Sequence, residues 1–229
     1  MIIFLILAAA VLPTAYFVLG QAKFGKAPSG ERLERILKSP HYKNGKFNNL
    51  NPTPQLAEDT SMPEIMFRFL FGKTPDKRPA QEFHFQKTDL KKLDPSQNAY
   101  VWMGHSSYFM QIDGKKILVD PVLSGYASPF SFTGKAFRGT DLYKPEDIPE
   151  LDYLIITHDH WDHLDYKTVL KLFPKTKKII TGLGTAEHLE YWGYNPKNIV
   201  ELDWFESSDL GEGFKVTAEP ARHFSGRGL

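Results

Sequence analysis

The hydrophobic pattern is clearest from residue 98 onward. Two apolar runs meet at Asp113 and Gly114, a dipeptide whose backbone favours the tight turn of a β-hairpin. The run 151–157 is apolar at most positions, which is typical of a buried strand. Residues 162–173 and 184–194 place apolar side chains at helical spacing, and short apolar runs follow both segments. Strands that alternate with helices predict a layered α/β architecture.

The region before this pattern, residues 21–95, is polar and rich in turn-forming residues. Within it, residues 29–39 predict a short helix capped by Ser29. Residues 62–72 predict a second helix that stops at Gly72. We therefore divide the chain into a segment 1–20, an N-terminal extension 21–95 and an α/β domain 96–229.

The first 19 residues are apolar, and no charged side chain precedes Lys23. A helix needs about 17–25 such residues to cross a bilayer, and the basic start of a secretory signal is missing. We predict a transmembrane anchor over residues 1–20, with a secretory signal segment as the alternative. The basic residues that follow favour a membrane-anchored protein whose body lies in the cytoplasm rather than the periplasm.

Composition limits the possible functions. The 229 residues are 41% hydrophobic, which is enough for one domain with a substantial core. The net charge is +1, so the overall charge predicts no nucleic-acid partner. Residues 21–95 carry 14 Lys and Arg against 9 Asp and Glu, a balance of +5 that favours anionic lipid headgroups or simply a solvated basic surface. The absence of cysteine excludes thiolate catalysis and Cys-ligated zinc.

The densest group of ionisable residues directly follows the buried apolar run. His158, His160 and His163 lie within six positions, together with Asp159 and Asp162. An extended backbone points His158 and His160 the same way. Asp162 and His163 are expected in the first turn of the next helix, which would turn them back toward the same point. Imidazole and carboxylate donors without a thiolate suit zinc, with manganese or iron as alternatives.

The motif HDHWDH, residues 158–163, lies after a buried strand and resembles the metal-binding motif of the metallo-β-lactamase superfamily. The segments "VWMGHSSYFMQIDGKKILVDPVLS" and "ARHFSGRGL" are similar to bacterial relatives of the N-acyl-phosphatidylethanolamine-hydrolysing phospholipase D. The resemblance covers nearly the whole chain from Gln21. It implies the N-terminal part of an αββα sandwich, here preceded by the N-terminal membrane helix, in a protein of the bacterial inner membrane.

The same resemblance implies a metal-dependent hydrolase with two divalent cations, expected to be zinc. Its substrate would be an N-acyl phospholipid, cleaved as a phosphodiester at a membrane, with a lactone or another ester as the alternative. His158, His160 and His223 would hold the first cation. Asp162 and His163 would hold part of the second, and Asp162 would be the catalytic residue.

Two further residues would support these ligands. Asp120 follows a predicted strand and would orient a ligand imidazole, but an aspartate before Pro121 also commonly begins a turn. His105 would lie near the floor of the site, but a core or turn histidine is an equal alternative. No role is predicted for His41, His84 and His188.

Relatives continue well beyond their counterpart of His223, whereas this chain stops at Leu229. The resemblance implies that a bridging aspartate and a last histidine would follow. The second site is therefore expected to be incomplete. We interpret the chain as a fragment or truncated form of a longer enzyme, with an inactive membrane-tethered remnant as the alternative.

Overall fold

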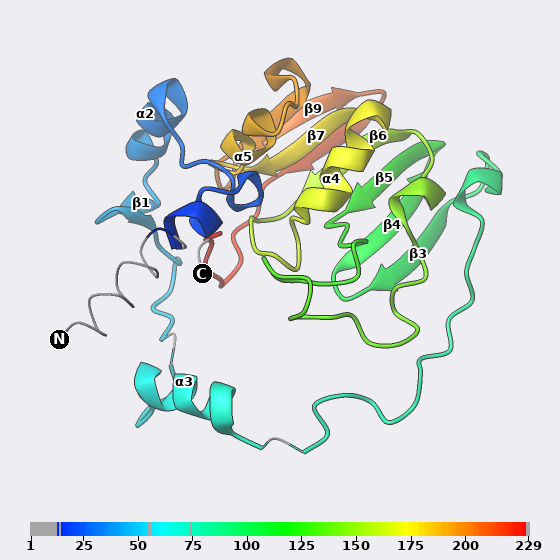
Figure 1. Cartoon of the computed structure of the whole chain (residues 1–229). Coiled ribbons are helices and arrows are strands. Elements are labelled where there is room, and N and C mark those ends of the chain that lie inside the picture. The colour runs from blue at the N-terminus through cyan, green and yellow to red at the C-terminus, as the bar shows by residue number, and fades with distance from the viewer. Residues whose placement is uncertain (1–12, 14, 55, 74, 228–229) are drawn as a thin grey trace.

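The centre of the molecule is a six-stranded β-sheet with the order β3-β4-β5-β6-β7-β8 (Figure 1). The computed structural model describes residue 13 and residues 15–54, 56–73 and 75–227. Strands β3 to β5 pair antiparallel, whereas β5 to β8 run parallel. The strands are β3 (Ala99–Gly104), β4 (Ser107–Ile112), β5 (Lys115–Val119), β6 (Leu151–Ile156), β7 (Thr176–Gly182) and β8 (Ile199–Leu202). This mixed sheet confirms the predicted α/β architecture.

The β4–β5 hairpin turns at Asp113 and Gly114, as the sequence predicts. Both residues have positive φ angles, 47° and 76°, and such a turn matches the twist of the two strands that it joins. The Asp113 N–H donates a hydrogen bond to Asn98 Oδ1 at 2.8 Å. The turn sets the register that pairs Phe109 with Leu118, both fully buried.

Helices α4 (Tyr166–Leu172) and α5 (Ala186–Tyr191) cover one face of the sheet (Figure 1). In strand β6, Leu154 and Ile156 are fully buried in the core cluster under the helices, whereas Tyr153 belongs to the cluster on the opposite face. A strand that contributes side chains to a core cluster on each face of the sheet must be apolar on both sides. This explains the continuous apolar run at residues 151–157.

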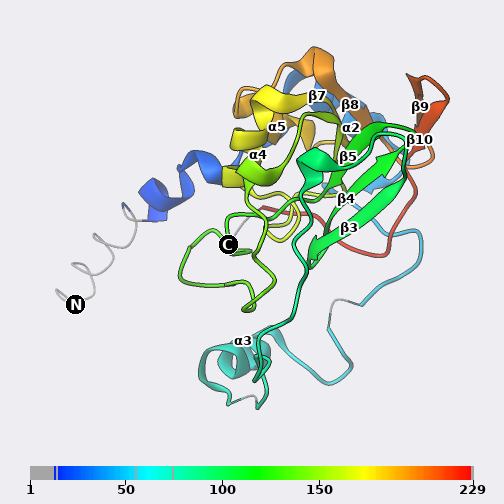
Figure 2. The same cartoon turned by 90° about the vertical axis from the view of Figure 1, so that its right-hand side faces the viewer.

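The opposite face packs against a hairpin of β9 (Ser207–Gly211) and β10 (Phe214–Thr217), which lies across the sheet from α4 and α5 (Figure 2). Phe214 contacts Tyr153 with ring centroids 6.2 Å apart. The sequence "FKVTAEPARHFSG" predicts a single strand over residues 214–226. This prediction is wrong, because β10 ends at Thr217 and residues 218–227 form no regular element. Pro220 lacks the N–H that a continuing ladder needs.

The N-terminal extension is fastened to the sheet by an ion-pair network. It comprises η1 (Ala22–Phe24), α2 (Gly30–Lys38), β1 (Tyr42–Lys43), β2 (Lys46–Phe47), α3 (Met62–Phe71) and η2 (Leu90–Lys92). Arg32 of α2 pairs with Glu187 at 2.6 Å, with Glu201 at 3.0 Å, and also with Glu190. Glu187 and Glu190 lie in α5 and Glu201 in β8, so this one guanidinium joins α2 to two elements of the domain.

Helix α3 lies apart from the sheet and packs little against the rest of the described chain (Figures 1 and 2). The Ser61 Oγ accepts a hydrogen bond from the Glu64 N–H at 3.4 Å and caps the helix. None of its residues is buried. Phe67, Phe69 and other large apolar side chains of α3 are exposed to solvent.

The prediction of a membrane helix over residues 1–20 is wrong for the part of it that the structure describes. No helix formed by the described residues has the length and apolarity to cross a bilayer. The helical stretch 15–19 ends at a turn at Gly20, and the separate 3-10 turn η1 follows. Residues 1–12 and 14 lie outside the described residues. The prediction of a membrane-anchored inner-membrane protein is corrected with it.

Candidate metal centre

The candidate site lies where neighbouring parallel strands end, the usual place for ligands in α/β sheets. Asp120 directly follows β5, and the loop 157–165 directly follows β6. The Asp120 N–H donates to the Ile155 carbonyl at 3.0 Å, which ties the two strand ends together. The sheet thus brings residues nearly forty positions apart to one edge.

Asp162 and His163 are not in the first turn of the following helix, so that prediction is wrong. The N–H groups of His163 and Leu164 both donate to the His160 carbonyl, at 3.0 and 2.8 Å. Helix α4 begins only at Tyr166, capped by Asp165, whose carboxylate accepts from the Lys167 N–H at 3.1 Å. This tight turn, rather than a helix, directs Asp162 and His163 back toward the strand ends.

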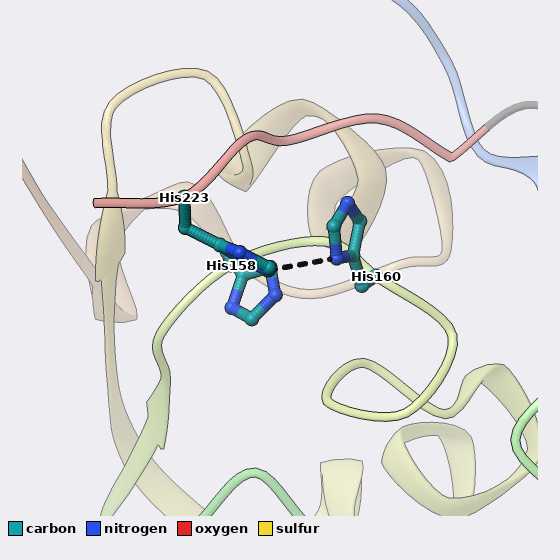
Figure 3. A group of neighbouring side chains, drawn as sticks. All are labelled: His158, His160 and His223. Atoms are coloured by element: carbon teal, nitrogen blue, oxygen red, sulfur yellow. Dashed lines mark hydrogen bonds between the residues drawn. The ribbon is translucent and has the colours of Figure 1, made fainter. Parts of the chain in front are cut away.

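Three histidines form the first group of potential metal ligands (Figure 3). One nitrogen from each of His158, His160 and His223 lies within 4.8 Å of the others. His223 reaches over the loop from the C-terminal segment, and its Nε2 lies 3.2 Å from His160 Nδ1. The structure therefore brings the three predicted first-site ligands together, although His223 is 63 residues from His160 in the sequence.

The imidazole of His158 has the chemistry that a cation site requires. Its Nε2 is buried and has no hydrogen-bond partner among the described residues. Burial, together with the neighbouring imidazoles, lowers the pKa of His158 to about 4, and burial also lowers the pKa of His160. Both rings are neutral at pH 7 and keep lone pairs for a metal. A buried nitrogen without a hydrogen-bond partner destabilises the folded protein, and a bound cation would supply the missing partner. These residues therefore fit a metal ion.

The second group consists of His105, Asp162 and His163, with one donor atom of each within 4.8 Å of the others. His105 Nε2 lies 2.9 Å from Asp162 Oδ2. The carbonyl of His105 accepts a hydrogen bond from the Trp102 indole at 2.9 Å, and His105 has a left-handed backbone with φ of 45°. A strained, fixed backbone thus holds the His105 ring against the carboxylate of Asp162.

Asp120 is 1% exposed and makes three contacts at the base of the site. Its carboxylate accepts from the Thr157 N–H at 2.8 Å and from the Thr157 hydroxyl at 2.7 Å, and lies 2.8 Å from His163 Nδ1. Burial alone would lower the pKa of His163, but the hydrogen bond and charge of Asp120 outweigh it and raise that pKa. The contact places the proton of His163 on Nδ1 and leaves Nε2 facing Asp162.

Asp162 itself is an anion in this arrangement. Burial alone would raise the pKa of Asp162, but its backbone hydrogen bond and the charges of His163 and His105 lower it. The second group therefore contributes one negative charge beside two imidazoles. The ligand and catalytic roles of these residues are still predictions.

Replacing Asp120 by asparagine is expected to lower the cation affinity of the second group by about 10–100-fold, the usual effect of losing a partner that orients a ligand histidine. The amide has one accepting oxygen where the carboxylate has two, so it cannot keep all three hydrogen bonds to Thr157 and His163, and His163 is held less firmly in its orientation. Isothermal titration of the metal-free chain with Zn²⁺ measures the effect. Asp113→Asn is the matched control, because Asp113 is an exposed aspartate with a nearly equal φ, 47° against 42°. An Asp120→Asn chain that binds as tightly as Asp113→Asn would show that Asp120 does not orient a ligand.

Sequence reasoning missed residues that surround the loop. Asp159 lies between two predicted ligands, and its carboxylate accepts from the Gly226 N–H at 2.8 Å and lies 3.5 Å from His188 Nε2. Arg227 is also buried against this loop. His188 received no role because a single helical histidine carries no local signal, and the contacts to Asp159 join segments far apart in sequence.

Comparisons with known proteins agree with this geometry. A family model described as a beta-lactamase superfamily domain matches residues 115–229, half of the chain. An uncharacterized protein of Mycobacterium tuberculosis is 35% identical over 83% of this chain and 51% of the relative. The N-acyl-phosphatidylethanolamine-hydrolyzing phospholipase D 1 of Caenorhabditis elegans is 35% identical over 56% of this chain and 38% of the relative. A UPF0173 metal-dependent hydrolase of Pyrobaculum neutrophilum is 28% identical over 56% of this chain and 51% of the relative.

The chain spans about half the length, or less, of these curated relatives. The matched half includes strand β5, the loop 157–165 and His223, which together carry most of the candidate metal centre. The match agrees with the resemblance that the HDHWDH motif carries. The chain belongs to the beta-lactamase superfamily.

Proposed function

We propose that this protein is a metal-dependent hydrolase that cleaves the phosphodiester of an N-acyl phospholipid, with one zinc ion held by the three histidines and a second held by Asp162 and His163. The observation that carries the proposal is the adjacency of the two groups. The ring centroids of His158 and His163 are 4.0 Å apart, so the first and second groups lie directly beside each other. Two cations held side by side would supply Lewis acidity and neutralise the charge that builds up on phosphorus during the reaction.

Two residues of the first group, His158 and His160, bind a cation with little competition from protons at pH 7. The pKa of His158 lies near 4, and the pKa of His160 is also lowered. Neutral imidazoles take up a cation without first releasing a proton. The carboxylate of Asp162 is the one anionic donor in the two groups. Its single negative charge would neutralise only part of the positive charge of two bound divalent cations. A net positive, loaded site attracts a phosphodiester anion.

His105 and Asp162 provide a place for a proton. Their Nε2 and Oδ2 atoms are 2.9 Å apart, and the His105 side chain is 61% exposed. A proton shared by this pair can pass to the oxygen of the leaving alcohol on the exposed side of the site, without a change in the more buried imidazoles. This is the role we propose for His105 in the departure of the alcohol.

The choice of substrate is supported by similarity. The relative from C. elegans bears the name of a phospholipase D that hydrolyses N-acyl-phosphatidylethanolamine. The uncharacterized relative from M. tuberculosis has the same identity over a larger share of the chain and adds no substrate. An N-acyl phospholipid is therefore the first substrate to test, and a lactone is the second.

The test is an assay of the purified 229-residue chain, loaded with Zn²⁺, on N-acyl-phosphatidylethanolamine in water enriched in ¹⁸O. Hydrolysis breaks the bond between phosphorus and the headgroup oxygen. Water supplies the new oxygen on phosphorus, and the N-acylethanolamine leaves as the alcohol. The expected result is phosphatidic acid that carries one ¹⁸O, detected by mass spectrometry.

Two outcomes would contradict the proposal. Activity on a lactone alone would replace the phosphodiester with a carboxylic ester as the substrate class. Absence of activity on both, in a chain that binds two equivalents of zinc, would reject hydrolysis by this chain. Metal content, measured by elemental analysis of the same sample, separates a chain that fails to load from one that fails to react.

A further inference from the structure

Arg227 joins segments that are far apart in the sequence. Its Nε donates to the Lys23 carbonyl at 2.8 Å, and its Nη1 donates to the carbonyls of Asp159 and Leu164 at 2.9 and 2.7 Å. The guanidinium lies over the Trp161 ring at 4.0 Å. The side chain is 6% exposed, so one buried cation holds both ends of the loop that carries His160.

The Asp159 carboxylate is held from a second direction. It lies 3.5 Å from His188 Nε2 and accepts the Gly226 N–H at 2.8 Å. His188 Nδ1 in turn accepts from the Lys26 N–H at 3.0 Å. Polar contacts thus run from the backbone at Lys26 through His188 to the loop.

The backbone of residues 22–26 lies against these same side chains. The Trp192 indole donates to the Ala22 carbonyl at 2.7 Å. The Phe24 ring packs edge-on against Trp161 at 5.3 Å. Gly25 has a φ of 77°, and a Cβ there would stand 2.0 Å from His188 Nδ1. Only glycine lets this segment approach His188 so closely.

We propose that Arg227, Asp159 and His188, together with the backbone of residues 22–26, form a positioning clamp for the three-histidine group. The clamp fixes the backbone on either side of His160. Because Gly226 and Arg227 belong to the segment that carries His223, it also sets where His223 meets the loop. None of the clamp residues offers a donor to the three-histidine group.

The physical reason is the angular demand of a metal site. Three imidazoles hold a cation tightly only when their lone pairs converge on one point, and small rotations of the loop would separate those lone pairs. Partners that orient ligands typically contribute about 10–100-fold to metal affinity. The inference rests on the proposed cation site but not on the substrate, and its test needs no turnover.

The first experiment compares Arg227→Met with Arg222→Met. Arg222 is exposed, lies in the same segment, and is the matched control for loss of an arginine charge near His223. Metal-free chains are titrated with Co²⁺, and both the dissociation constant and the visible absorption spectrum are recorded. We expect Arg227→Met to raise the dissociation constant of the three-histidine group by about 10–100-fold and to alter the spectrum. Arg222→Met should stay within about twofold.

The second experiment compares Gly25→Ala with Gly45→Ala. Both glycines have a φ of 77°, so an added methyl group strains both backbones equally. At Gly45 nothing lies within 4 Å of the new Cβ, whereas at Gly25 it displaces His188. We expect only Gly25→Ala to weaken Co²⁺ binding, through a residue that contacts no proposed ligand.

Each donor group is measured by itself to separate positioning from loss of folding. In the Asp162→Asn background only the three-histidine group keeps all its donors, so it is measured alone. In the His160→Asn background the second group is measured alone. The clamp is supported when Arg227→Met and Gly25→Ala weaken the first group and leave the second within about threefold. It is overturned when both groups weaken equally, which indicates general destabilisation, or when neither weakens. Circular dichroism of the metal-free chains identifies unfolded variants, and Arg227→Lys replaces Arg227→Met where that variant is unfolded.

Discussion

Replacing His158 by asparagine is expected to abolish hydrolysis and to weaken Zn²⁺ binding at the three-histidine group by roughly 10³-fold, more than the loss of a supporting partner would cause. His158 is the innermost of the three rings, and its Nε2 is buried without a partner among the described residues. Asparagine is too short to bring a donor to the same point. Turnover of the N-acyl phospholipid and calorimetric titration with Zn²⁺ measure the two effects.

The same variant should leave the metal-free chain nearly as stable as before. His158 Nε2 makes no hydrogen bond that the change removes, and Nδ1 lies 3.0 Å from the hydroxyl of Thr157 in an exposed contact. We therefore expect the free energy of unfolding to change by less than about 1 kcal/mol. His84→Asn is the control for the chemistry of the substitution, because His84 is exposed and lies outside both donor groups. Full zinc affinity in His158→Asn would remove His158 from the ligand set.

Replacing Leu154 by alanine should lower the free energy of unfolding by about 3–5 kcal/mol, the upper part of the range for Leu→Ala changes in cores. Leu154 is completely buried in the middle of β6, between Leu118 of β5 and Ile179 of β7. The two neighbouring strands are hydrogen-bonded to β6 and cannot close over the cavity. Urea unfolding of the metal-free chain, followed by circular dichroism, gives the value.

Leu170→Ala on α4 is the comparison for this core change. Leu170 is 37% exposed, so the same loss of atoms removes less buried surface, and alanine favours the helix. We expect an effect below about 1 kcal/mol. Equal effects at Leu154 and Leu170 would contradict the core described for β6. Since domains are stable by only about 5–15 kcal/mol, Leu154→Ala should also reduce the yield of folded chain.

Much of the architecture could be predicted because its signals are local. Asp113 and Gly114 encode their turn through positive φ angles, and the apolar run of β6 encodes burial on both faces. The HDHWDH motif indicated where donors gather, since six residues after a strand end cannot lie far apart. Local signals of this kind need no knowledge of the rest of the fold.

The errors and omissions have a common cause. The apolar neighbours of Asp162 and His163 have helical spacing and so predict a helix, yet the N–H groups of His163 and Leu164 donate to the His160 carbonyl in a turn before the helix begins. The contacts of Arg227 and His188 depend on tertiary approach, which periodicity does not report. The membrane helix was predicted from apolarity alone, and no described helix has the required length.

The contact between Arg227 and the Lys23 carbonyl has a consequence for how the molecule forms. It joins residues 204 positions apart, nearly the whole length of the chain. Closing so long a loop is entropically unfavourable until the sheet has already brought its ends together. A growing chain holds the Lys23 carbonyl without its Arg227 partner until residue 227 has been synthesised. We therefore expect the three-histidine group to be among the last parts of the domain to assemble, so that metal capture follows folding instead of guiding it.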